Sequence, residues 1–111
     1  MVLASNEAFV AFRDMFPVNE GHTLIVSRRH VHDMFDLSAP EFALLQEILH
    51  TVKSAIDQHL HPQGYNIGAN CGTVAGQTVP HFHLHVIPRY SGDVQNPRGG
   101  IRNIKKPIRP Y

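Results

Sequence analysis

Three histidines alternate with apolar residues in the segment His81-Phe82-His83-Leu84-His85. If this segment is a β-strand, successive side chains point to opposite faces, so the imidazoles share one face while Phe82 and Leu84 share the other. An imidazole titrates near neutrality and can act as a nucleophile, a proton carrier or a metal ligand. The spacing therefore predicts a strand with one packed face and one reactive face.

Metal binding and nucleophilic attack are the two chemical interpretations of that face. Along a strand, His81 and His85 would lie about 13 Å apart, at roughly 6.6 Å per two residues, too far to share one zinc ion at a zinc–nitrogen distance of about 2 Å. The pattern therefore favours attack on phosphorus by the central ring, His83, with no metal site or other cofactor predicted. Zinc-dependent hydrolysis, which would need ligands from elsewhere in the chain, is the alternative. A histidine-rich polar sheet face without catalytic activity is the third interpretation.

A segment that suits phosphate binding stands directly before the histidines. Gly76-Gln77-Thr78 offers an amide side chain, a hydroxyl and accessible backbone N–H groups, and phosphoryl transfer needs such donors around the phosphate oxygens. The tripeptide is weak evidence alone and becomes stronger beside the alternating histidines.

The surrounding elements follow from local patterns. Runs of β-branched and aromatic residues predict strands at Ala8–Arg13, His22–Ser27, Tyr65–Asn70 and Val79–Ile87. A helix is expected from about residue 39 to 60, after the capping-box residues Ser38 and Glu41. Its apolar stripe is Phe42, Leu45, Leu49, Val52, Ile56 and Leu60. This order of elements indicates an α+β domain with an antiparallel sheet.

Composition limits the class of protein. The 111 residues are expected to form a single domain, with a core over residues 1–90 and an irregular basic tail rich in proline and glycine over residues 91–111. A net charge of +1 gives no general argument for a polyanionic partner, and the single cysteine favours a reducing compartment. Without a long apolar run or a signal-peptide pattern, we expect a soluble, cytoplasmic protein that does not bind membranes.

At this point the sequence resembles a known family. His81-Phe82-His83-Leu84-His85-Val86-Ile87 matches the histidine triad (HIT) signature, and Gly76-Gln77-Thr78-Val79 matches the segment that precedes it. The likeness extends from about residue 8 to 90 and includes Phe12-Arg13-Asp14, Gly21-His22 and Asn70. It implies an α+β fold with an antiparallel sheet, one long helix and a short helix, and a homodimer.

The resemblance also implies roles for individual residues. His83 would be the nucleophile that forms a nucleotidyl-histidine at the α-phosphate, His85 would contact the phosphate and orient the nucleophile, and His81 would support the leaving-group side. Contacts with the phosphates and the leaving group are implied for Gln77, Thr78, Val79 and Asn70. Asp14 would bind the ribose hydroxyls, and Phe12, with Arg13 and Met15, would belong to the base and ribose pocket. His22 would be a buried histidine whose hydrogen bond supports the triad. The other histidines match no catalytic position and are expected at the surface: His30, His32, His50, His59 and His61.

The resemblance points to a nucleotide hydrolase or transferase acting on a purine nucleotide. Dinucleoside polyphosphates such as diadenosine tetraphosphate are the favoured substrates, with nucleoside phosphoramidates or nucleotide binding with little turnover as the alternatives. Cations of the tail, among them Arg98 and Arg102, are candidates to meet distal phosphates, although solvated or dimer-contacting charge is the simpler interpretation. Nucleic-acid processing is not favoured, because no large basic face and no accessory zinc finger is evident.

Overall fold

The computed structural model describes residues 2–104, so the tail cations Lys105, Lys106 and Arg109 lie outside the described residues. The strands are β1 (Val2–Ser5), β2 (Phe9–Arg13), β3 (Thr23–Ser27), β4 (Gly64–Gly68) and β5 (His83–Arg89), the long helix is α1 (Ala39–Leu60), and three 3₁₀ turns are η1 (Met34–Asp36), η2 (Thr73–Ala75) and η3 (Gly100–Arg102). These elements confirm the α+β class.

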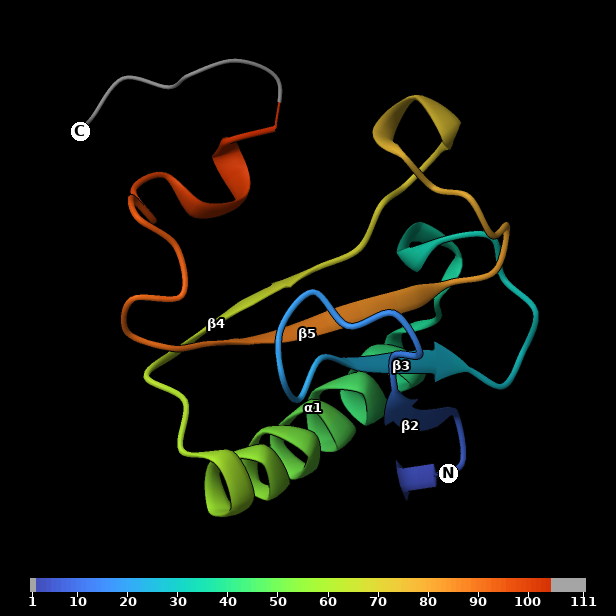
Figure 1. Ribbon diagram of the computed structural model, residues 1–111. Helices are drawn as coiled ribbons and strands as arrows, with labels where there is room; N and C mark the ends of the chain where they lie inside the picture. Colours follow the sequence, from blue (N-terminus) through green and yellow to red (C-terminus); the bar gives the residue numbers. More distant parts are fainter. Residues whose placement is uncertain (1, 105–111) are drawn as a thin grey trace.

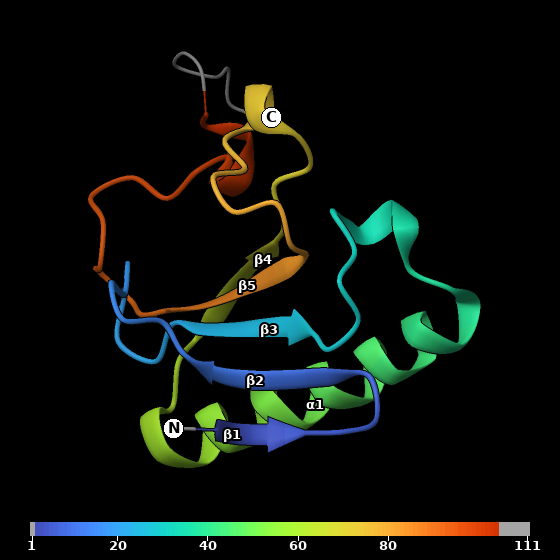
Figure 2. The same cartoon turned by 90° about the vertical axis from the view of Figure 1, so that its right-hand side faces the viewer.

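The strands form one antiparallel sheet in the order β1-β2-β3-β5-β4. Helix α1 runs across one face of this sheet, whereas η2 and η3 lie on the side of the sheet away from α1 (Figures 1 and 2). The strand β5, which carries the histidines, is therefore an interior strand held between β3 and β4. Side chains on its α1 face pack into the core, and those on its other face are available for a site.

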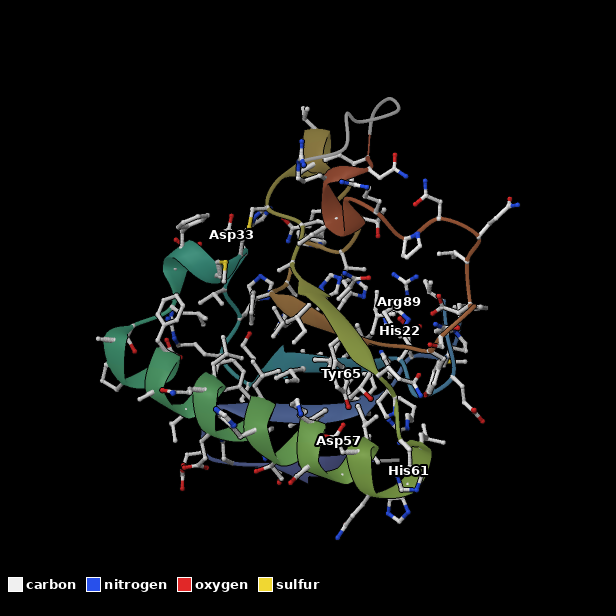
Figure 3. The ribbon with its side chains drawn as sticks, turned by 90° about the vertical axis from the view of Figure 1, so that its left-hand side faces the viewer. His22, Asp33, Asp57, His61, Tyr65 and Arg89 are labelled. Carbon is white, nitrogen blue, oxygen red and sulfur yellow. The ribbon has the colours of Figure 1, made fainter. Side chains whose placement is uncertain are left out.

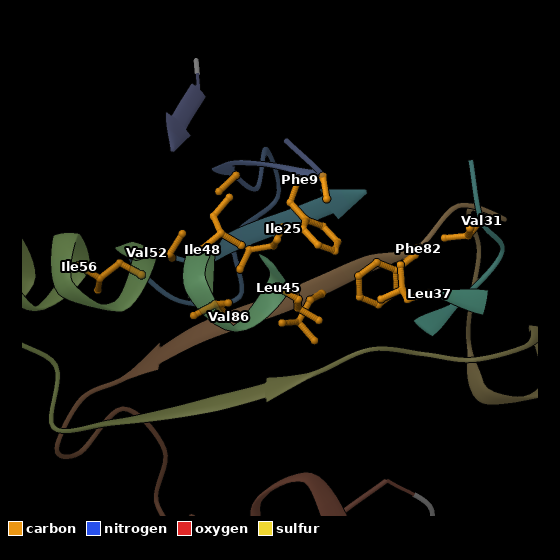
Figure 4. Packing of buried hydrophobic residues seen from close by; sticks show 13 residues of the cluster. Phe9, Ile25, Val31, Leu37, Leu45, Ile48, Val52, Ile56, Phe82 and Val86 are labelled. Carbon is orange, nitrogen blue, oxygen red and sulfur yellow. The ribbon is translucent and has the colours of Figure 1, made fainter. Parts of the chain in front are cut away.

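The core lies between the sheet and α1 (Figure 4). Its helical contribution comes from Leu45, Ile48, Val52 and Ile56, which are all buried. The predicted stripe was therefore partly wrong: it omitted Ile48 and included Phe42, which is 43% exposed. Periodicity alone locates the stripe to within about one residue, because the helix can rotate until its largest side chains fit the sheet.

The ends of α1 agree with their sequence signals. The Ser38 hydroxyl accepts from the backbone N–H of Glu41, and the Glu41 carboxylate accepts from the backbone N–H of Ser38, which completes the capping box. At the other end His61 adopts a left-handed conformation with φ of 52°, directly before Pro62. The helix predicted from about residue 39 to 60 is confirmed.

The strand predicted at Val79–Ile87 was displaced, since β5 begins at His83 and continues to Arg89. Before His83 the backbone turns, with His81 N–H donating to the Val79 carbonyl at 2.9 Å and Phe82 N–H donating to the Val31 carbonyl at 2.8 Å. The Pro88 carbonyl accepts from the Asn19 side chain and therefore points away from β4. Because the N–H and C=O of one strand residue point the same way, the N–H that proline lacks would also face Asn19 and not β4, so the proline is tolerated inside the strand.

The other strand predictions were correct within two residues at each end, while β1 was missed. Four residues near the start of the chain carry too little alternation to be recognised as a strand, and only pairing with β2 reveals β1. Among residues 2–104, no helix combines the length and apolar character needed to cross a bilayer.

Candidate functional site

Strand pairing gives the histidine face of the sheet its neighbours. In the register, His85 lies opposite Leu24 of β3, and Leu24 lies opposite Phe12 of β2. Phe82, Leu84 and Val86 are buried in the core on the α1 side, each 5% exposed or less. The predicted division into a packed face and an open face is therefore confirmed for β5.

The ring of His83 is held by the backbone before it. Its Nδ1 lies 2.9 Å from the carbonyl oxygen of His81. Because a carbonyl only accepts, this contact assigns the ring proton of neutral His83 to Nδ1. The lone pair is then on Nε2, which is the form of imidazole that can attack an electrophile.

A second chain of contacts fixes the tautomer of His85. The backbone N–H of Val18 donates to Nδ1 of His22 at 3.0 Å, so the proton of a neutral His22 is on Nε2. That Nε2 lies 2.9 Å from Nδ1 of His85, which must accept. The remaining proton of His85 is therefore on its Nε2. The rings of His83 and His85 pack edge to face with centroids 5.3 Å apart, so neighbouring rings carry an accepting nitrogen in one case and a donating nitrogen in the other.

Electrostatics agree with neutral rings in this chain. His22 is 2% exposed, and burial lowers its pKa below the ordinary value, although the nearby Asp14 carboxylate opposes this shift. Burial is also the main cause that lowers the pKa of His85, and the neighbouring His22 and His83 rings lower it further, against the opposing charge of Asp14. Both rings therefore stay neutral at neutral pH.

The first histidine of the pattern, His81, is held differently from the other two. It precedes β5, and its Nε2 lies 2.7 Å from the Ser27 carbonyl oxygen and 3.2 Å from the Ser27 hydroxyl. Its Nδ1 lies 3.0 Å from Nδ1 of His30. Contacts with Ser27 at the end of β3 and with His30 after it therefore hold this ring, whereas strand pairing positions His83 and His85.

A groove of about 980 Å³ opens beside His85 on the same face of the sheet. Its walls are mainly apolar and come from β4, β5, η2 and the segment around η3, with polar side chains from Asn66, Asn70, His22, His85 and Arg102. In Figure 3 the labelled His22 and Arg89 lie on the side of the sheet away from α1. A cleft with apolar walls and a few polar groups is typical of sites for small organic ligands.

Comparison with known proteins agrees with this geometry. The family model described as HIT domain matches residues 1–92. The chain belongs to the HIT family. A crystal structure of a HIT family protein from Bacillus anthracis is 38% identical, with a TM-score of 0.76, and the match covers 80% of this chain and 63% of that protein.

Two HIT relatives have names that describe an activity. An AP-4-A phosphorylase of Mycobacterium tuberculosis is 35% identical over 84% of this chain and 48% of its own length. A bis(5'-nucleosyl)-tetraphosphatase of Schizosaccharomyces pombe is 37% identical over 75% of this chain and 46% of its own length. The chain thus spans about half the length of these two relatives.

The residues matched to the HIT nucleoside pocket occupy two faces. Phe12 is half-buried on the histidine face, and Asp14 follows β2 with a carboxylate oxygen 3.5 Å from Nε2 of His22. Arg13 pairs with Thr23 in the register, and its guanidinium donates to the Gly21 carbonyl and to the Thr23 hydroxyl. Because Thr23 is fully buried on the α1 side, the expectation that Arg13 lines the pocket was wrong: strand alternation turns its side chain to the other face.

The phosphate-contact predictions fall on the loop before β5. Thr78, Val79 and Asn70 are exposed, whereas Gln77 is 6% exposed. The Gln77 amide donates to the carbonyls of His32 and Val79, and its oxygen accepts from the Gly72 N–H. In this structure Gln77 therefore ties the loop together, and its contact with a phosphate stays a prediction.

Sequence reasoning missed two residues of the site. Leu24 lies between Phe12 and His85 in the register, and the alternation of its strand was the available signal. His30 is exposed, as expected, but its contact with His81 had no signal in the sequence. His30 and His81 are 51 positions apart, and only the fold brings them together.

One group of side chains in this HIT site is close enough to suggest a cation. Ligand atoms of Asp14, His22 and His85 lie within 4.8 Å of one another. A cation would need the Nε2 lone pair of His22, but the Val18 N–H occupies the Nδ1 lone pair and so places the ring proton on Nε2. Hydrogen bonding accounts for this close approach.

Proposed function

We propose that this HIT protein transfers a nucleoside monophosphate group to His83 and then to water, acting on dinucleoside polyphosphates such as diadenosine tetraphosphate. The observation that carries the proposal is the contact between Nδ1 of His83 and the His81 carbonyl, because it leaves a lone pair on Nε2 of a ring that packs against His85, whose own proton is on Nε2. A phosphate needs both an attacking lone pair and a hydrogen-bond donor for its oxygens.

In the first step the Nε2 lone pair of His83 forms a bond to the α-phosphorus. The bond between that phosphorus and the leaving oxygen breaks, and the leaving group departs with the electron pair. Bond formation puts positive charge on the His83 ring, and the His81 carbonyl stabilises this charge by accepting from Nδ1–H. In the second step water attacks phosphorus and releases a proton, while the electrons of the nitrogen–phosphorus bond return to Nε2.

The other residues would bind and orient the substrate. His85 donates from Nε2 to a nonbridging oxygen, and His81 supports the leaving-group side. Exposed groups near the triad complete the phosphate contacts, namely Thr78, Val79 and Asn70, while Gln77 holds their loop and approaches the phosphates. Asp14 accepts from ribose hydroxyls, and the purine lies against Phe12 and Leu24 on the histidine face.

The names of two relatives support the choice of substrate. The yeast relative is a bis(5'-nucleosyl)-tetraphosphatase and the mycobacterial relative an AP-4-A phosphorylase, so both names point to dinucleoside polyphosphates. They differ in the group that accepts the nucleotide. With water the second step yields AMP, and with inorganic phosphate it yields ADP, so the nucleotide released in the presence of phosphate identifies the acceptor.

We also propose that the protein is a homodimer. In the described sheet β4 is an edge strand, paired with β5 on one side only, and it is continuous with an apolar groove. Edge strands with free backbone groups pair readily with another chain, and a two-fold axis would pair β4 with its own copy. Light scattering or sedimentation would give the oligomeric state.

Trapping the covalent intermediate tests the chemistry. Purified protein would be mixed with diadenosine tetraphosphate, quenched within milliseconds and analysed by intact mass and peptide mapping. We expect a nucleotidyl group on His83 and complete loss of turnover in His83→Ala, with nucleotide binding retained. His50→Ala removes an exposed histidine of α1 and is the matched control. Full turnover by His83→Ala, or wild-type activity that disappears with a chelator, would contradict the proposal.

A further inference from the structure

We propose that His30 is a positioning residue for His81, and that its Nδ1–H holds the His81 ring in one tautomer on the leaving-group side. This inference rests on the proposed function for its kinetic consequence. The observation behind it is the 3.0 Å contact between the two Nδ1 atoms, with ring centroids 5.0 Å apart. His30 follows β3 by three residues and is exposed.

The contact assigns a direction to the hydrogen bond. Nε2 of His81 faces the Ser27 carbonyl at 2.7 Å, and this carbonyl only accepts, so Nε2 carries the proton of a neutral His81 ring. Its Nδ1 then has a lone pair and must accept. The partner nitrogen, Nδ1 of His30, therefore donates, and the Nε2 lone pair of His30 is left on the exposed side of the pair.

His81 depends on this support more than the other two histidines do. His83 and His85 are held by backbone pairing with Val26 and Leu24 in β3, whereas His81 lies in the turn before β5. Its side chain is fixed by Ser27 on one side of the ring and by His30 on the other. Without the His30 donor, the half-buried ring gains rotational freedom and a second tautomer becomes accessible.

The geometry of amide side chains provides a sharp test. An asparagine side chain places its NH₂ near the position of a histidine Nδ1, while a glutamine side chain places its NH₂ near the position of Nε2. His30→Asn therefore keeps the donor to His81, and His30→Gln removes it while remaining polar. His30→Ala removes the whole side chain, and His50→Ala again controls for loss of an exposed histidine.

The kinetic test compares two substrates with different leaving groups. Diadenosine tetraphosphate releases a polyphosphate that needs support at the leaving oxygen, and the 4-nitrophenyl ester of AMP releases an activated aryl oxide that needs less. For His30→Ala and His30→Gln we expect kcat to fall about 5- to 10-fold with diadenosine tetraphosphate, which is the effect expected for the loss of one hydrogen bond. With the ester, kcat should change little. His30→Asn should remain within about twofold of wild type on both substrates.

A spectroscopic measurement separates this inference from the proposed chemistry. Ring ¹⁵N chemical shifts report the tautomer of each histidine without any turnover. We expect His81 to carry its proton on Nε2 in the wild type and in His30→Asn, and to show mixed tautomers in His30→Ala. Absence of a His83 adduct in the wild type would refute the proposed function and leave this tautomer test intact. Unchanged His81 shifts in His30→Ala, equal losses on both substrates, or failure of His30→Asn to restore kcat would overturn the inference.

Discussion

Replacing His22 by asparagine and by glutamine would divide its two hydrogen bonds between two variants. In His22→Asn the side-chain oxygen can still accept from the Val18 N–H, but no donor reaches Nδ1 of His85. In His22→Gln the longer side chain can still donate to His85, but the Val18 N–H loses its acceptor. The two variants therefore separate control of the His85 tautomer from support of the loop.

The sizes of the two effects follow from the environment of each bond. His85 is partly buried, and an unpaired polar atom in such a position costs about 1–3 kcal/mol, so His22→Asn should reduce kcat/KM by about 10- to 100-fold. Val18 is 73% exposed, and water can replace part of its lost hydrogen bond. For His22→Gln we therefore expect a loss of about 1 kcal/mol in the free energy of unfolding, about 4–8 °C in Tm, and activity within about threefold of wild type.

Steady-state kinetics, thermal unfolding and ring ¹⁵N shifts of His85 would be measured on the same preparations. The expected pattern is a catalytic defect in His22→Asn with the proton of His85 distributed over both nitrogens, and a stability defect in His22→Gln with that proton still on Nε2. If the asparagine variant were as active as the glutamine variant, the assigned directions of the hydrogen bonds from Val18 to His22 and from His22 to His85 would be wrong.

Two further predictions concern stability. Gly21 has φ of +88°, and a Cβ there would lie 2.6 Å from Leu60 Cδ1 and 3.1 Å from Pro88 Cγ. Gly21→Ala should therefore lower the free energy of unfolding by about 3 kcal/mol through backbone strain and overpacking, and lower Tm by about 10–20 °C. A Tm within about 3 °C of wild type would contradict this. The lowered pKa values of His22 and His85 mean that the unfolded chain binds protons first as the pH falls below about 6.5. Their contribution to stability is therefore complete above that pH and is lost below it, by up to about 1.4 kcal/mol per pH unit for each histidine. Urea unfolding between pH 7.5 and 5.5 measures this slope, and a flat profile would refute it.

The parts of the fold that could be predicted are those specified by local chemistry. Ser38 and Glu41 cap α1 through side-chain contacts three residues apart, so the start of the helix was visible in the sequence. The alternation of Phe82, Leu84 and Val86 with the histidines likewise assigned the two faces of β5 correctly. Both features depend on neighbours along the chain.

The parts that could not be predicted depend on partners far apart in the sequence. The start of β5 is set by the pairing of the Phe82 backbone with Val31, and the polar atoms of Gln77 are occupied partly by the distant carbonyl of His32. The sequence predicts that Arg13, next to Asp14, is a pocket residue. The strand register pairs it with Thr23 and so places its side chain on the core side of the sheet. The two faces of β5 were therefore predictable from the sequence, whereas the face of Arg13 and the hydrogen-bond directions required the fold.

The opposite hydrogen-bond senses of His83 and His85 have a consequence for ligand discrimination. One ring presents a nitrogen that can only accept or attack, and the next presents a nitrogen that can only donate, as long as both remain neutral. A group that only donates, such as an ammonium, satisfies the first nitrogen but leaves the second without an acceptor, and a bare anion that satisfies the second is repelled by the lone pair of the first. Inhibitors should therefore combine an electron-poor centre with an adjacent oxyanion, as sulfonyl or phosphonate groups do, and compounds with only one of the two features should bind weakly.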